Sequence, residues 1–149
     1  VLGYIAQGRA DGGTGLEASR LPDDPRLSDG YFVRPVIFTD LPETSRCIRE
    51  EIFGPVTAVQ RISSLEEAIR KANDSPYGLA ATIWTSNLKT AMQAVHQLEA
   101  GFVQVNQNLV VQPNLSYGGI KQSGLGKEAS LEAMLEHFTH KKTAIINMT

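Results

Sequence analysis

The sequence has almost no cysteine, no long apolar run and no excess of charge of either sign. Its single cysteine, Cys47, cannot form a disulfide within the chain, which fits a reducing compartment. The net charge of -2 gives no electrostatic reason to expect nucleic acid or an anionic membrane as a partner. Apolar runs such as residues 144–146 fall far short of the roughly 20 residues of a membrane helix, and no signal-peptide pattern opens the chain. We therefore expect a cytoplasmic protein.

The 149 residues are enough for one domain with a core. A chain of about this size buries roughly two-thirds of the surface that it exposes when unfolded. The apolar fraction of 42% is ordinary for a globular protein. The chain begins at Val1, without a methionine and inside a predicted helix, which indicates a fragment or a processed product.

The N-terminal part predicts a short helix, a long loop and a strand. Apolar spacing places a helix at the start, which Gly12 and Gly13 would end. Residues 12–30 are rich in Gly, Asp, Pro and Ser and predict a surface loop. Residues 31–38 are aromatic and β-branched and predict a strand, in which Pro35 favours an edge position or a bulge.

The middle of the chain alternates strands with helices. The predicted strands are residues 56–62, 80–84 and 102–105; the helices between them begin after Ser63 or Ser64 and near Asn87, with Gly101 as a C-cap. This alternation implies right-handed crossovers and a parallel sheet with helices on both faces, which is the α/β class.

The C-terminal part predicts a long loop, a helix and a final strand. Residues 106–126 are irregular and rich in glycine, and loops of this length are usually functional or disordered. Apolar residues within it, among them Leu109 and Val110, favour a shaped loop. Residues 127–138 show helical apolar spacing, and residues 143–148 are β-prone and need a strand partner.

Four motifs carry a family resemblance. The two longest are Glu-Glu-Ile-Phe-Gly-Pro at residues 50–55 and Tyr-Gly-Gly-Ile-Lys-Gln-Ser-Gly-Leu-Gly-Lys-Glu at residues 117–128. Two shorter motifs lie between them, at residues 75–80 and 101–106. In this order and spacing they resemble the aldehyde dehydrogenase superfamily over nearly the whole chain.

The resemblance implies a division of the chain and an activity. Residues 1–139 would be the C-terminal part of the catalytic domain, and residues 140–149 a strand that joins a neighbouring subunit of a dimer or tetramer. In this family a cysteine thiolate attacks the aldehyde, hydride passes to NAD or NADP, and water activated by a glutamate releases the carboxylic acid. The matching cysteine and glutamate belong to motifs upstream of Val1, so we expect no catalytic residue here and an inactive isolated chain.

Glu51 and Phe53 are the cofactor-binding candidates. By resemblance, Glu51 accepts hydrogen bonds from the nicotinamide ribose hydroxyls, for which a carboxylate offers two strong acceptors. Phe53 matches the aromatic residue that packs beside the nicotinamide end. Without the family, the alternative is that Glu50 and Glu51 are a solvated helix end and that Phe53 is a core residue.

Tyr117 and Val111 are the substrate-binding candidates. By resemblance, residues 107–117 shape the aldehyde entrance and Tyr117 faces the reactive thiol; the alternative is that Tyr117 only fills the core under the loop. The family usually has an aromatic residue at the position of Gln104 and often one at that of Val111, so this chain departs from it at both. No Lys or Arg occurs between residues 102 and 120, which favours a neutral aldehyde over an acidic one.

Three other features lack the pattern that their chemistry requires. Cys47 has no general base beside it in the sequence, so we interpret it as structural. The histidines at 96, 137 and 140 lack ligand spacing, and we assign no metal site. The glycines of residues 118–126 do not lie between a strand and a helix as a phosphate loop requires.

Two alternatives to a hydrolytic aldehyde dehydrogenase stay open. One is the acylating branch of the family, in which transfer to CoA or phosphate replaces hydrolysis and the water-activating glutamate upstream is absent or replaced. The other is a non-catalytic assembly or binding module, which an assay with aldehydes and NAD or NADP would separate from an enzyme.

Overall fold

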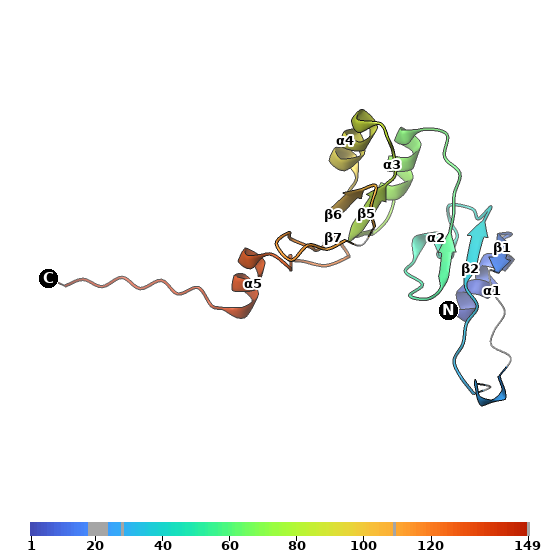
Figure 1. Ribbon diagram of the computed structural model, residues 1–149, viewed down its shortest axis with the longest axis horizontal. Helices are drawn as coiled ribbons and strands as arrows, with labels where there is room; N and C mark the ends of the chain where they lie inside the picture. The colour runs from blue at the N-terminus through green and yellow to red at the C-terminus, as the bar shows by residue number, and fades with distance from the viewer. Residues whose placement is uncertain (18–23, 28, 109, 149) are drawn as a thin grey trace. The chain divides into compact units, whose positions relative to one another are not determined.

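The computed structural model describes residues 1–17, 24–27, 29–108 and 110–148 (Figure 1). The chain divides into two compact units, Val1–Arg61 and Ile62–Thr149, called here the N-terminal unit and the C-terminal unit. Each is described by itself. None of the helices in the described ranges is both long and apolar enough to span a membrane.

The N-terminal unit is a small three-stranded sheet with two helices. Its elements are α1 (Leu2–Ala10), β1 (Thr14–Glu17), the 3-10 helix η1 (Pro25–Leu27), β2 (Val36–Thr39), α2 (Arg46–Arg49) and β3 (Val56–Ala58). The strand order is β1-β2-β3, in which β2 pairs antiparallel with β1 and parallel with β3. Because α2 connects the parallel pair, these elements form a short βαβ unit.

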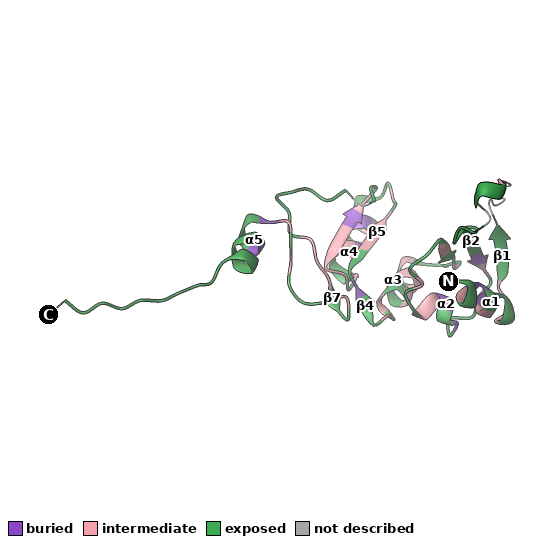
Figure 2. Ribbon diagram, turned by 90° about the horizontal axis from the view of Figure 1, so that it is seen from below, coloured by how far each residue is buried: buried purple, intermediate pink, exposed green. Residues whose placement is uncertain are grey.

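The core of this unit joins α1, β2 and α2. Phe38 of β2 is completely buried, and Ile5, Cys47 and Leu41 pack around it. Figure 2 shows the buried part of β2 in purple. A side chain at Gly8 of α1 would collide with the Phe38 ring. Glycine inside a helix normally costs stability, and here it lets α1 lie close against the sheet.

The sequence predictions for this unit hold for α1 and for the start of β3 at Val56, although that strand ends at Ala58 and not at residue 62. The segment between them needs correction. The segment predicted as a loop, residues 12–30, contains the strand β1. Residues 18–23 and 28 of that segment lie outside the described residues. The strand predicted at residues 31–38 begins only after Pro35, whose missing N–H does not interrupt the ladder there. The edge position predicted from Pro35 is wrong, because β2 lies between β1 and β3.

The C-terminal unit contains a second βαβ arrangement. Its elements are α3 (Leu65–Asn73), β4 (Tyr77–Gly78), β5 (Ala80–Ile83), α4 (Leu88–Gln97), β6 (Phe102–Val105), β7 (Ile120–Lys121) and α5 (Leu131–Phe138). β5 and β6 pair in parallel across α4, and β4 pairs antiparallel with β7. α4 packs against both α3 and β6. The alternation of elements and the parallel pairs confirm the predicted α/β class.

Side-chain caps define the start of each helix in this unit. The side chains of Ser64, Asn87 and Ser130 accept hydrogen bonds from the backbone N–H three residues further on, at the starts of α3, α4 and α5. The first two caps confirm the predicted helix starts. The third shows that α5 begins later than the predicted residue 127, because Ser130 is the residue that caps it.

The predicted C-cap of α4 and the predicted C-terminal strand differ from the structure. Gly101 is not the C-cap of α4, which is Leu98; instead, Gly101 lies so close to the Gly118 carbonyl oxygen that a side chain would collide with it. Residues 143–148 belong to no strand within the described part of the chain, and Ile145 is 93% exposed. Pairing of this segment with another subunit stays a prediction.

Candidate functional site

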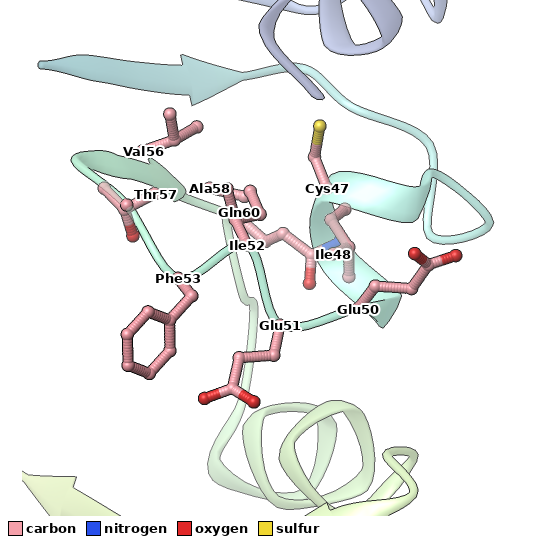
Figure 3. Close-up of a pocket in the computed structure, with 11 residues that line it drawn as sticks. Cys47, Ile48, Glu50, Glu51, Ile52, Phe53, Val56, Thr57, Ala58 and Gln60 are labelled. Carbon is pink, nitrogen blue, oxygen red and sulfur yellow. The ribbon is translucent and has the colours of Figure 1, made fainter. Parts of the chain in front are cut away.

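The segment between α2 and β3 borders a cavity of about 390 Å³ in the N-terminal unit (Figure 3). α2 stops at Glu50, whose backbone is extended, so the following residues leave the helix as a loop. Glu51 and Phe53 lie in that loop, and Thr57 contributes to the lining from β3. The two cofactor-binding candidates therefore come together at one concave surface.

Glu50 is bound on two sides within the N-terminal unit. Arg46 donates two hydrogen bonds to its carboxylate, at 2.7 and 2.8 Å, and the Tyr4 hydroxyl donates a third at 2.7 Å. Donation by Arg46 and Tyr4 lowers the pKa of Glu50 to about 2. The Arg46 guanidinium also lies over the Tyr4 ring, 5.1 Å from its centroid. Glu50 thus ties α1 to the end of α2.

Glu51 has a different environment from its neighbour. Its side chain is exposed, and it makes no hydrogen bond or ion pair with any residue that the structure describes. Figure 3 shows the Glu51 carboxylate and the Phe53 ring pointing to the same side, away from the Cys47 sulfur. Glu50 is therefore held at the end of the helix by Arg46 and Tyr4, whereas Glu51 lies beyond the helix with both carboxylate oxygens open to solvent or a ligand.

Phe53 is held in an unusual backbone conformation. Its φ of 50° lies in the left-handed region, which a bulky residue rarely adopts and which tends to occur at functional sites. The side chain is 88% exposed in this chain and lies outside the core of the N-terminal unit. A carboxylate and an exposed aromatic ring beside one cavity suit a ligand that carries hydroxyl groups next to a flat ring.

Cys47 lies on the core side of the same segment. It is 6% exposed, and its Sγ donates a hydrogen bond to the Tyr4 carbonyl oxygen, 3.2 Å away. These are the contacts of a packed core residue. Within the described residues, no three His, Cys, Asp or Glu side chains gather in a way that could hold a metal ion.

The substrate-binding candidates belong to the C-terminal unit. Tyr117 is half-buried, and its ring meets the Phe102 ring edge to face with a centroid distance of 5.2 Å. Its backbone pairs with that of Glu128. Val111 lies in the loop after β6 and is 44% exposed. The contact with Phe102 is compatible with the alternative in which Tyr117 only fills space under the loop. Val111, by contrast, is exposed.

Sequence reasoning missed two sets of contacts around these sites. The four-residue spacing of Arg46 and Glu50 on one helix was a signal for their ion pair, but nothing local indicates Tyr4 as the third member. Gln104 stood out only as a departure from the family. In the structure it is buried, and its Nε2 donates a hydrogen bond to the Val110 carbonyl oxygen at 3.1 Å.

Comparison with known proteins agrees with the fold and the motifs. Residues 1–144 match the aldehyde dehydrogenase family. The chain is 40% identical to a 2-aminomuconic semialdehyde dehydrogenase of Bos taurus, over 98% of this chain and 30% of that protein. It is 37% identical to a betaine aldehyde dehydrogenase of Brucella melitensis, over 99% of this chain and 30% of that protein. The chain belongs to the aldehyde dehydrogenase family.

Solved structures show the same relationship. An indole-3-acetaldehyde dehydrogenase of P. syringae, in complex with NAD+ and IAA, matches 89% of this chain and 26% of its own with a TM-score of 0.81 and 42% identity. A betaine aldehyde dehydrogenase of Staphylococcus aureus, in complex with NAD+, matches 90% of this chain and 27% of its own with a TM-score of 0.82 and 34% identity. The chain therefore spans less than a third of the length of these relatives.

Proposed function

We propose that this chain is the part of an NAD(P)-dependent aldehyde dehydrogenase that holds the nicotinamide end of the cofactor and one wall of the aldehyde entrance. The observation that carries the proposal is the contrast between two adjacent glutamates. Glu50 is fully engaged by Arg46 and Tyr4, whereas Glu51 has no partner in the described chain and points to the same side as Phe53.

Glu51 and Phe53 fit the cofactor by their chemistry. The Glu51 carboxylate would accept hydrogen bonds from the two ribose hydroxyls, and the Phe53 ring would pack beside the nicotinamide. The bound dinucleotide supplies a hydride acceptor. Both solved relatives named above are complexes with NAD+, which supports NAD or NADP as the cofactor.

The reactive thiol of this enzyme would lie in another part of the polypeptide. The chain contains one cysteine, Cys47, which is buried in the core and hydrogen-bonded to the Tyr4 backbone. A nucleophile needs a base beside it, and the partner of the Cys47 thiol in the described residues is a backbone carbonyl oxygen. The share of the relatives that this chain covers leaves room for the nucleophile and the water-activating glutamate elsewhere.

Tyr117 and Val111 would contact the aldehyde. The loop that carries them has no Lys or Arg, so it offers no fixed positive charge for a substrate carboxylate. The relatives are named for three different aldehydes. Their named aldehydes differ in charge, so the substrate class that we propose, a neutral aldehyde, rests on the residues of this loop alone.

The full-length protein is the enzyme of which we propose this chain to be a part. Assaying it tests hydrolytic aldehyde oxidation against the acylating branch and against a non-catalytic module. With NAD or NADP and a series of neutral aldehydes, we expect the reduced cofactor to form without CoA and the product to be the free carboxylic acid. Product analysis by mass spectrometry distinguishes the reaction classes. An absolute requirement for CoA or phosphate, with an acylated product, would assign the protein to the acylating branch. No turnover with any aldehyde would favour a non-catalytic module.

The second part of the proposal concerns residues 140–149, which would form an oligomerisation strand in a dimer or tetramer, with residues 1–139 as the catalytic-domain part. Ile145 and Ile146 are largely exposed in this chain, and the backbone of residues 143–148 pairs with no described strand. An extended apolar segment that belongs to no described strand is suited to adding a strand to another sheet.

Removing residues 143–149 from the full-length protein is therefore expected to lower its oligomeric state and to leave the fold of each subunit intact. α5 ends at Phe138 and is capped by Ser130, so the truncation leaves the helix and its cap in place. Sedimentation velocity measures the change, with Lys142→Ala as a control that keeps the strand. An oligomer of unchanged size after the truncation would show that another surface holds the subunits together.

A further inference from the structure

Gln104 is a buried polar side chain in the middle of β6, with 5% of its surface exposed. Burying an amide without a hydrogen bond costs free energy, so each such group needs a partner. The other buried polar residues in the described part of the chain, Ser45 and Ser130, cap helices and so have a local reason for burial. The partner of Gln104 is different, because it lies in the loop that follows the strand.

The loop after β6 is fastened to one face of that strand at two points. Phe102 and Gln104 are two residues apart on β6 and therefore lie on the same face. The Phe102 ring holds Tyr117 by an edge-to-face contact, and the Gln104 amide donates to the Val110 carbonyl oxygen. Tyr117, and Val110 next to the second substrate candidate Val111, are thus both contacted by side chains of a single strand.

The start of the loop is fixed separately. Asn106 adopts a left-handed φ of 54°, which asparagine tolerates better than most residues. Its side chain accepts from the Thr85 N–H at 2.8 Å and donates to the Thr85 carbonyl oxygen at 2.9 Å. Between this anchor and Tyr117, two described side-chain contacts reach the loop from the strands: Thr82 of β5 donates to Asn108 Oδ1 at 3.4 Å, and Gln104 donates to the Val110 carbonyl oxygen at 3.1 Å. Only the second involves β6.

We propose that Gln104 is a specificity-determining positioning residue: its amide holds Val110, and with it Val111, at a fixed distance from β6 and so sets the width of the aldehyde entrance. The proposal rests on the function proposed for this loop. Val110 and Val111 are 46% and 44% exposed, so the segment that Gln104 holds is not itself part of the buried core. Loss of the amide should therefore change the shape of the loop more than the stability of the fold.

The test uses Gln104→Met in the full-length protein, because methionine has a similar length and cannot donate. We expect the ratio of kcat/KM for a bulky aldehyde to that for a small one to change by about tenfold, as for other altered pocket contacts. The change should come mainly from KM for the bulky aldehyde, with kcat for the small aldehyde retained. Hydrogen–deuterium exchange should become faster in residues 110–116. Gln97→Met, the same replacement on the exposed end of α4, should change neither measurement.

A second variant, Gln104→Leu, keeps a similar side-chain size and removes the amide altogether. It should also speed hydrogen–deuterium exchange in residues 110–116 and change the kcat/KM ratio between bulky and small aldehydes. Unchanged exchange in residues 110–116, an equal loss of kcat/KM for all aldehydes, or failure of both variants to fold would each overturn the inference. Such results would mean that Gln104 serves the core of the sheet alone.

Tyr117→Ala separates the inference from the proposed function. If Tyr117→Ala reorders the preference among aldehydes of different bulk while both Gln104 variants leave it unchanged, the role of Gln104 is wrong and the function of the loop stands. If Tyr117→Ala does not reorder the preference either, the loop is not a substrate wall, and the proposed function of this region fails. The exchange measurement still decides whether Gln104 fastens the loop.

Discussion

Replacing Glu51 with glutamine in the full-length protein is expected to slow hydride transfer by about a hundredfold, the scale of a small misplacement of a reacting group. Dinucleotide affinity should change much less, because the lost interaction positions only the nicotinamide end and leaves the rest of the cofactor bound. Single-turnover formation of NADH or NADPH measures the chemical step, and a binding titration with the oxidised cofactor measures the affinity.

Glu50→Gln is the matched control, since it makes the same chemical change at the adjacent residue. It weakens the contacts with Arg46 and Tyr4 that fix the end of α2. We expect it to affect local stability more than the hydride step. A single-turnover rate that is unchanged in Glu51→Gln, or reduced equally in both variants, would remove Glu51 from its assigned role.

The second large effect concerns the 149-residue chain on its own, which is expected to produce no NADH or NADPH from any aldehyde. Its Cys47 is buried and hydrogen-bonded inside the N-terminal unit, and nothing in the described residues presents a base to it. The measurement is absorbance of the reduced cofactor, with the full-length protein assayed in parallel. Activity of the isolated chain that disappears on Cys47→Ala would mean that Cys47 is the nucleophile after all.

The fold is predictable from sequence where local patterns determine it. The alternation of strands and helices between residues 56 and 105 follows from apolar periodicity, and Ser64 and Asn87 lie where capping residues are expected. β1 was missed for a physical reason. All four of its residues are exposed, so no alternation marks it, and its pairing with β2 depends on a distant part of the chain.

The candidate site is likewise predictable from sequence only in part. The motif around Glu51 and Phe53 is visible in the sequence, but the different states of the two glutamates are not. That difference depends on the Tyr4 hydroxyl, which lies 46 residues from Glu50 in the chain. The burial of Gln104 likewise depends on where the loop places the Val110 carbonyl oxygen. Both are tertiary contacts, which a local pattern does not contain.

The most direct test of the central claim is a crystal structure of the full-length protein with NAD+ bound. The Glu51 carboxylate is expected within hydrogen-bond distance of the nicotinamide ribose hydroxyls, with Phe53 beside the nicotinamide ring and Glu50 still bound to Arg46. A structure in which Glu51 remains in solvent, or in which Glu50 leaves Arg46 to bind the ribose, would contradict the assignment of this segment as the nicotinamide-end site.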